Sequence, residues 1–207
     1  MTQSRKRLII IGAGSLGVMT LDAALEMDRY DTISFIDDGK EINSLIHNYK
    51  VLGGLNVLQE ISVKEFDFVI AIANNKVRKK VADEHQLNYV NIIHPQVSIS
   101  RFAKIGKGNI IMPNTSIDPE TVIDNHVIIN KNSSLGHNVE MKNYTQASPG
   151  CSLGGTIGEG TFIGLGGVVL PEIKIGEFST IGAGAVVTKN IPGHVTAVGI
   201  PAKIIKE

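Results

Sequence analysis

The stretch SIDPETVIDNHVIINKNSSLGHNVEM (residues 116–141) carries an aliphatic residue or methionine at every sixth position. This spacing extends from near Val97 almost to the end of the chain, with one slip of two residues between Leu153 and Ile157. The positions are Ile99, Ile105, Ile111, Ile117, Ile123, Ile129, Leu135, Met141, Ala147 and Leu153, then Ile157, Ile163, Val169, Ile175, Ile181 and Val187. Neither the helical period nor the two-residue strand period produces this pattern. A fixed short repeat predicts a solenoid.

The repeat also predicts the shape of the solenoid. Three six-residue units complete one turn of a triangular prism whose flat faces are single short strands, so each residue stacks on the one eighteen positions away. About five turns fit between Val97 and Val187. Glycine often follows the aliphatic position, as in Ile163-Gly164, and it tolerates the positive φ of a tight corner.

The first 95 residues follow a different pattern, in which short apolar runs alternate with helical segments. Strands are predicted at 7–11, 32–36, 66–73 and 89–93, and helices at about 15–27 and 76–85. Such alternation favours a small parallel α/β sheet. We therefore predict two domains, an α/β domain over residues 1–95 and an all-β solenoid over residues 96–207.

A glycine-rich loop, GAGSLG (residues 12–17), follows the first predicted strand and opens the first predicted helix. With Asp37 about twenty residues further on, it satisfies the dinucleotide-binding fingerprint, in which the helix N-terminus holds a pyrophosphate and the acid holds a ribose. Four strands in 95 residues leave no second mononucleotide-binding half, and the sequence shows no hydride-transfer site. We therefore favour a nucleotide-sugar, which also carries a diphosphate, and keep NAD as the alternative ligand.

Composition argues against several other functions. Twenty Lys and Arg balance twenty Asp and Glu, so we expect neither nucleic acid nor an acidic membrane surface as a partner. The longest apolar runs are too short for a membrane span, and no cluster of metal ligands is evident. The single cysteine, Cys151, excludes an internal disulfide and falls on a small inward position, where packing is expected. Cytoplasm is the expected location.

Further motifs complete the pattern: FIDD (residues 35–38), IAIANNKVRKK (70–80), IIHP (92–95) and VGIPAK (198–203). With the glycine loop and the six-residue repeat, they resemble the sugar acetyltransferase family over nearly the full chain. That family includes the UDP-4-amino-sugar N-acetyltransferases of the bacillosamine pathway and the sialic acid O-acetyltransferases. The resemblance implies a small Rossmann-like domain, a left-handed parallel β-helix and an acetyl-CoA-dependent transferase that needs no metal.

His137 matches the catalytic histidine of that family, the general base that accepts a proton from the acceptor. Its spacing from Leu135 and Val139 independently predicts that its side chain points out of the prism. In an eighteen-residue column its neighbours are Pro119 and Gly155, and we expect Gly155 to leave room beside the imidazole.

The residue after His137 departs from the family pattern. Relatives usually have an acid there, whereas this chain has Asn138. An amide orients an imidazole but does not raise its basicity, so we expect a weaker base, or support from a carboxylate such as Glu140. The slip beside His137 either reshapes the pocket or forms a tighter corner without functional effect.

The resemblance also implies where the ligands lie. The residues expected to bind the nucleotide sugar are Gly14, Ser15, Leu16, Asp37, Asp38 and Ala73. The residues expected to bind acetyl-CoA are Gln146, Gly155, Leu165, Ala183 and Lys203. Relatives form homotrimers in which cofactor and acceptor lie between neighbouring prisms.

The sequence is therefore interpreted as an acetyl-CoA-dependent N-acetyltransferase acting on a nucleotide-linked amino sugar, with His137 and Asn138 at the catalytic position. One alternative is an O-acetyltransferase that acts on a free sugar or sialic acid. A second, of another class, is a non-catalytic nucleotide-sugar or NAD-binding module whose repeat serves assembly.

Overall fold

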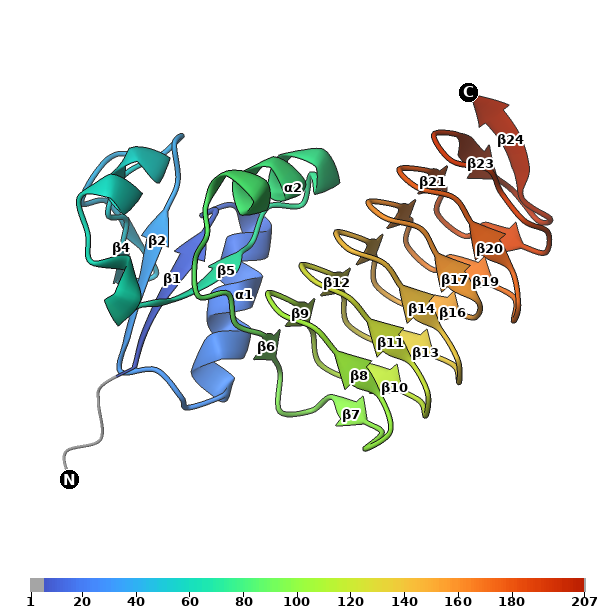
Figure 1. Ribbon diagram of the computed structural model, residues 1–207, viewed down its shortest axis with the longest axis horizontal. Helices are drawn as coiled ribbons and strands as arrows, with labels where there is room; N and C mark the ends of the chain where they lie inside the picture. Colours follow the sequence, from blue (N-terminus) through green and yellow to red (C-terminus); the bar gives the residue numbers. More distant parts are fainter. Residues whose placement is uncertain (1–5, 207) are drawn as a thin grey trace.

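The structure, a computed structural model, describes residues 6–206. An N-terminal α/β part is followed by a long left-handed β-helix, and the chain ends at the far end of that helix (Figure 1). This is the predicted fold class. The predicted first domain also includes residues 1–5, which lie outside the described range.

The N-terminal part is built on three parallel strands in the order β2-β1-β5. Its strands and helices are β1 (Arg7–Ile11), α1 (Ser15–Glu26), β2 (Thr32–Ile36), β5 (Asp67–Ile70) and α2 (Asn75–Glu84). Between β2 and β5 lie the hairpin β3 (Leu45–Ile46) and β4 (Tyr49–Lys50) and the 3-10 helices η1 (Leu55–Gln59) and η2 (Val63–Glu65). The apolar run of β1 is buried from Leu8 to Ile11, as expected for the central strand of a covered parallel sheet.

The predicted fourth strand of this sheet, residues 89–93, is divided between the two parts of the molecule. Tyr89 bridges Phe68 next to the sheet, whereas Ile92 and Ile93 form β6, which pairs with a strand of the β-helix. The segment is too short to serve both partners along its whole length. Because β6 pairs with β9, the β-helix begins a few residues before the predicted boundary at residue 95. The division into two domains at that residue stays a proposal.

The β-helix has three parallel faces, which we call the first, second and third face. The first face contains β7 (Ser98–Ile99), β10 (Ser116–Ile117), β13 (Ser134–Leu135), β16 (Ser152–Leu153), β19 (Val168–Val169) and β22 (Val186–Val187). The second contains β8 (Lys104–Ile105), β11 (Val122–Ile123), β14 (Glu140–Met141), β17 (Thr156–Ile157) and β20 (Lys174–Ile175). The third contains β6 (Ile92–Ile93), β9 (Ile110–Ile111), β12 (Ile128–Ile129), β15 (Gln146–Ala147), β18 (Phe162–Ile163), β21 (Thr180–Ile181), β23 (Thr196–Val198) and the antiparallel β24 (Lys203–Lys206).

Strand pairing confirms the predicted stacking. Ile117 pairs with Leu135, eighteen residues on, and each inward aliphatic position from Ile117 to Val187 is at most 3% exposed. The slip remains within one coil, where Leu153 pairs with Val169, sixteen residues on. The three faces thus stay in register across the slip. The same corner, between the first and second faces, is shortened again near the end of the β-helix, where Ile191 follows Val187 by four residues and bridges Ile175.

The N-terminal part covers the beginning of the third face. Leu21 and Ala24 of α1 share a hydrophobic core with Ile110 and Ile128, whose side chains point outward from the prism. Arg78 of α2 adds a polar connection: the side chain is fully buried and donates to the carbonyl oxygens of both parts. The two parts are therefore joined by apolar packing and by polar contacts, of which the Arg78 guanidinium group is the most deeply buried.

His126 lies beside that guanidinium group. Its ring stacks on Tyr144, with centroids 5.4 Å apart, and meets Tyr89 edge-on at 4.6 Å. Burial, together with the positive charge of Arg78, lowers the pKa of His126 to about 4. The imidazole is therefore neutral in the folded protein at neutral pH.

His126 gives an expected pH dependence of stability. Its folded pKa lies below the unfolded value of about 6.5, so the unfolded chain binds the proton more readily between these values. The free energy of unfolding should therefore decrease as the pH is lowered from about 6.5 to about 4, and this group accounts for up to about 3 kcal/mol of the decrease. His126→Phe, which keeps an aromatic ring, should reduce the slope in urea unfolding at pH 7, 5.5 and 4, whereas the exposed control His194→Phe should not. An unchanged slope in His126→Phe would contradict this assignment.

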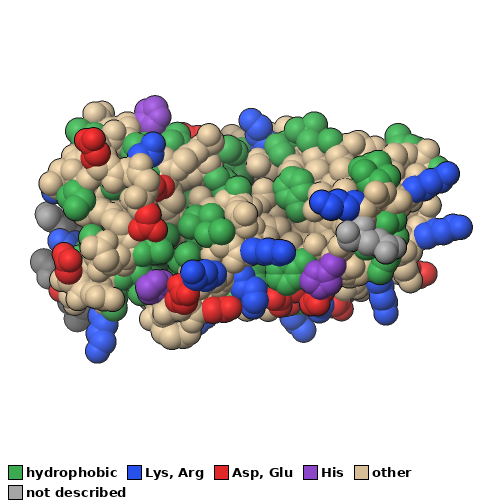
Figure 2. All heavy atoms as spheres, turned by 90° about the horizontal axis from the view of Figure 1, so that it is seen from above, with side chains coloured by type: hydrophobic (Ala, Val, Ile, Leu, Met, Phe, Trp, Pro, Cys, Tyr) green, Lys and Arg blue, Asp and Glu red, His purple; other side chains and the backbone are tan. Residues whose placement is uncertain are grey.

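Charged side chains of both signs are interspersed along the middle of the face in Figure 2. Among the ion pairs of the structure, Lys79 lies 3.3 Å from both Asp83 and Glu159. Among residues 6–206, no helix is long and apolar enough to cross a membrane. No group of three or more His, Cys, Asp or Glu in the same range is arranged to hold a metal ion.

Candidate functional site

His137 lies at the corner between the first and second faces, directly after β13. Its side chain is exposed, whereas Leu135 and Val139 on either side are fully buried, so it points outward as predicted. The Asn138 amide nitrogen lies 2.9 Å from Nδ1 of His137. Pro119 is the neighbour in the preceding coil, because its carbonyl oxygen accepts from the Asn138 N–H at 3.3 Å.

The shortened corner lies on the other side of His137. Leu135 pairs with Leu153 and Glu140 pairs with Thr156, so four residues in one coil face only two in the next. Gly155 therefore stacks on Val139, and no residue stacks on His137 or Asn138 from that side. The prediction that Gly155 stacks on His137 is therefore wrong, because the shortened corner moves Gly155 onto Val139. The predicted open space beside the imidazole is present.

Glycine is required to close this corner in so few residues. Gly155 has a φ of +67°, and a Cβ atom there would collide with the carbonyl oxygen of Ile173 in the following coil. At Gly154 a Cβ atom would lie 2.7 Å from the backbone nitrogen of Pro171. The following coil has a corner of full length, so the shortened corner forms a notch between two normal coils.

A cavity of about 270 Å³ occupies this notch. Its lining is Asp118, Ser134, Gly136, His137, Ser152, Leu153, Gly154, Val168, Val169, Leu170 and Pro171. The side towards the N-terminal coils is polar, with serine hydroxyls and one carboxylate, and the side towards the C-terminal coils is apolar. His137 thus stands where a polar acceptor and an acyl group could meet.

The carboxylate predicted to support His137 is engaged elsewhere. Glu140 lies on the second face and pairs with Lys142 at 2.7 Å, a hydrogen bond that also raises the pKa of Lys142. It does not line the notch. Asp118 is the carboxylate that does.

The glycine loop forms a second region, at the C-terminal ends of the parallel strands. Gly12 has a φ of +106°, and a Cβ atom there would lie 2.7 Å from the carbonyl oxygen of Ala71. Gly14 precedes the first turn of α1, which has no side-chain cap. The first N–H groups of the helix, at Ser15 and Leu16, therefore remain available to an anion.

Asp37 and Asp38 face this loop and line a cavity of about 270 Å³ with Gly12 and Leu55. Asp37 accepts hydrogen bonds from the N–H groups of Ala13 at 2.7 Å and Gly39 at 2.8 Å. Asp38 accepts one from the N–H of Leu55 at 2.8 Å. The two carboxylates therefore fix the loops as well as facing the cavity.

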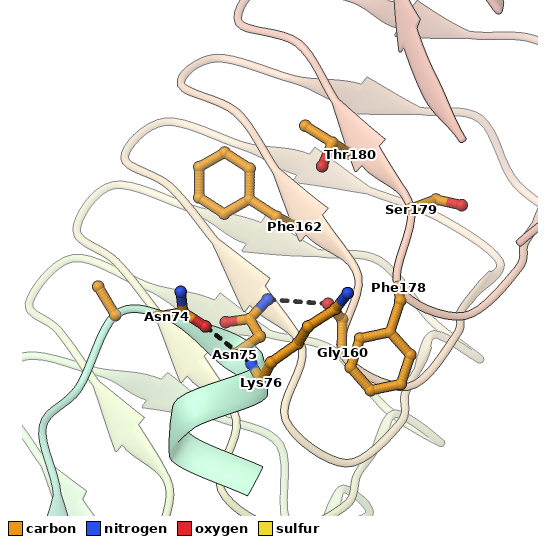
Figure 3. A pocket seen from close by; sticks show the side chains of 9 residues that line it. Asn74, Asn75, Lys76, Gly160, Phe162, Phe178, Ser179 and Thr180 are labelled. Carbon is orange, nitrogen blue, oxygen red and sulfur yellow. Dashed lines mark hydrogen bonds between the residues drawn. The ribbon is translucent and has the colours of Figure 1, made fainter. Parts of the chain in front are cut away.

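Ala73 lies in a different cavity, of about 290 Å³, where α2 meets the β-helix (Figure 3). Asn74 caps α2 through its side-chain oxygen, and the Asn75 amide donates to the carbonyl oxygen of Gly160 at 2.9 Å. Lys76 extends over the ring of Phe178, with its Nζ 5.9 Å from the ring centroid. The cavity with Ala73 adjoins the one with Asp37 and Asp38 along the chain, because Ile72, the residue before Ala73, lines the latter.

None of the residues predicted to bind acetyl-CoA lines the notch. Leu165 and Ala183 are exposed on adjacent coils at the corner between the third and first faces. Lys203 is exposed on β24. Gln146 lies on the third face, 9% exposed, and among described residues its Oε1 has no hydrogen-bond partner.

Sequence reasoning did not identify Asp118 or Arg78. The stacking rule would have found Asp118, which lies eighteen residues before Gly136 and so belongs to the coil next to His137. Arg78 has no such signal, because it is one of several basic residues in the predicted helix at 76–85.

Comparisons with known proteins agree with this architecture. A family model described as the PglD N-terminal domain matches residues 7–85. The acetyltransferase domain of PglB from Neisseria gonorrhoeae FA1090, in complex with acetyl coenzyme A, is similar to 97% of this chain and 100% of that chain, with 30% identity and a TM-score of 0.92. A histidine-to-alanine mutant of GDP-perosamine N-acetyltransferase from Caulobacter crescentus, in complex with CoA and GDP-perosamine, is similar over 97% of both chains, with 26% identity and a TM-score of 0.91.

The curated relatives match this chain over a segment of only 51 or 52 residues. The galactoside O-acetyltransferase of Escherichia coli (strain K12) is 48% identical over 52 residues, 25% of this chain and 26% of the relative. The chain thus spans about a quarter of the length of the curated relatives it matches. Because the match to the PglB acetyltransferase domain covers that domain completely at 30% identity, the chain belongs to the family of hexapeptide-repeat, left-handed β-helix sugar acetyltransferases.

Proposed function

We propose that this protein transfers an acetyl group from acetyl-CoA to the amine of a nucleotide-linked amino sugar. The observation that carries this proposal is the notch, which places an exposed imidazole between a polar and an apolar wall on a β-helix of this family. The structural relatives bound to CoA and GDP-perosamine support both classes of substrate. No metal ion takes part in the proposed reaction.

His137 acts as the general base in direct transfer. The acceptor amine attacks the thioester carbonyl while Nε2 of His137 accepts a proton, and backbone N–H groups stabilise the resulting oxyanion. The imidazolium then supplies a proton to the departing thiolate. For Nε2 to accept, Nδ1 must carry the hydrogen, which the Asn138 amide oxygen binds when the amide is rotated by about 180°.

The nucleotide sugar is held at the glycine loop. The N–H groups after Gly14, at Ser15 and Leu16, bind the diphosphate, while Asp37 and Asp38 face the ribose or base. Ala73 contacts the sugar through its backbone. On the donor side, Leu165, Ala183 and Lys203 guide CoA along the C-terminal coils. Gln146 is left out of this site because the side chain is buried.

The geometry supports a homotrimer. The N-terminal part covers the third face, whereas the notch opens at the corner between the first and second faces. Within one chain, the prism therefore stands between the glycine loop and His137. A closed threefold assembly brings the glycine loop of one protomer to the notch of its neighbour.

Release of the CoA thiol from acetyl-CoA tests the proposal, with GDP-, UDP- and dTDP-linked 4-amino and 3-amino sugars and free sialic acid as acceptors. We expect turnover with one nucleotide-linked amino sugar. Turnover with sialic acid alone would replace the proposal with O-acetylation. Binding of a nucleotide sugar without any binding of acetyl-CoA would replace it with a non-catalytic module.

A further inference from the structure

The notch contains a carboxylate that the proposed mechanism does not use. Asp118 is exposed at the corner after β10 and lines the same cavity as His137. The backbone N–H of Asp118 donates to the carbonyl oxygen of Leu135 at 3.0 Å, which fixes the residue in the coil next to Gly136 and His137. This position is set by strand pairing and not by a free loop.

Asp118 has no cationic partner among the described residues. No ion pair joins it to any residue between 6 and 206, and the described lining of the notch includes neither Lys nor Arg. His137 is the other ionisable group of the lining, and the remaining polar side chains there are the hydroxyls of Ser134 and Ser152. The notch therefore carries a negative charge on its polar wall.

The charge matters because the two candidate acceptors differ in charge. An amino sugar is largely protonated near neutral pH and enters as an ammonium group, whereas a sugar hydroxyl is neutral. A carboxylate within a cavity favours the ammonium through a charge-assisted hydrogen bond. The apolar wall, with Val168, Leu170 and Pro171, offers no such contact and suits the acyl group.

We propose that Asp118 is a specificity-determining residue that binds the acceptor ammonium group beside His137 and so selects an amine over a hydroxyl. This inference rests on the proposed function, since it concerns the same acceptor. The proton balance is complete: of the three ammonium protons, one stays on the amide nitrogen, one reaches the CoA thiol and one is released to solvent.

Matched pairs of ligands test this assignment by calorimetry. GDP-perosamine and GDP-rhamnose differ at one position, amine against hydroxyl, and the corresponding UDP- and dTDP-linked pairs extend the series. We expect the wild-type protein to bind the amine about tenfold more tightly, at the low end of the range for a hydrogen bond to a charged group. Asp118→Asn should reduce this ratio to about twofold or less. Glu120→Gln removes the same charge from the same corner, outside the notch, and should retain the wild-type ratio.

The outcomes separate this inference from the proposed function. If Asp118→Asn keeps the wild-type ratio, the assignment of Asp118 is overturned and the transferase proposal stands. If the ratio collapses only in Asp118→Asn, the assignment holds even where thiol release is not detected. If the wild-type protein binds no nucleotide-linked amine, the proposed function fails, and the role of Asp118 fails with it.

Discussion

His137→Ala is expected to lower kcat by about 10²- to 10⁴-fold, the usual contribution of a positioned general base. The imidazole is exposed at a corner, and among residues 6–206 its one side-chain hydrogen bond is to Asn138, so its removal leaves the core intact. The melting temperature and the affinity for the nucleotide sugar should therefore stay close to the wild-type values. The loss should appear in the chemical step, measured as CoA thiol release in a single turnover.

A matched control separates this role from a general effect of losing a histidine. His194 is another exposed histidine of the β-helix. Its Nε2 lies 3.2 Å from Glu177, and it does not line the notch. His194→Ala should keep wild-type turnover, and added imidazole should partly restore His137→Ala. A kcat within threefold of wild type in His137→Ala would remove His137 from the mechanism.

The β-helix could be predicted from sequence because every coil repeats the same local rule. An inward aliphatic residue at every sixth position stacks only on neighbouring coils, so the pattern encodes the packing directly. The position of the slip was also visible, between Leu153 and Ile157. Its consequence was not, because a column count assigns Gly155 to His137, whereas strand pairing after the corner moves Gly155 onto Val139.

The junction of the two parts could not be predicted from sequence. Residues 89–93 have the composition of a strand, but their partner depends on where the sheet of the N-terminal part ends and the third face begins. The buried state of Arg78 depends on the same docking. Periodicity assigns an arginine in a basic helix to the solvent, and only the assembled junction supplies the carbonyl oxygens that it binds.

Arg78→Met is expected to destabilise the protein by about 4 kcal/mol, a large share of the 5–15 kcal/mol typical of folded proteins. The guanidinium donates to the carbonyl oxygens of Ile72 at 2.7 Å, His126 at 2.9 Å and Tyr144 at 2.7 Å. Methionine fills a similar volume but leaves these buried acceptors without donors, each at a cost of about 1–3 kcal/mol. Burial lowers the pKa of Arg78 to about 9, so the native group is charged at neutral pH.

Urea unfolding distinguishes this effect from the loss of any basic residue on α2. Lys80→Met removes a charge from the same helix, where the native side chain is 73% exposed, and should change the free energy of unfolding by less than about 0.5 kcal/mol. Arg78→Lys keeps the charge but not the planar fork that reaches carbonyls of both parts, so its stability should lie between Arg78→Met and wild type. Because Arg78 joins the N-terminal part to the β-helix, its loss should also let the two parts unfold in separate transitions. A single transition with wild-type stability in Arg78→Met would show that the remaining contacts of the junction, the apolar packing of α1 on the third face and the polar contacts of Asn75 and Lys79, hold the two parts together without Arg78.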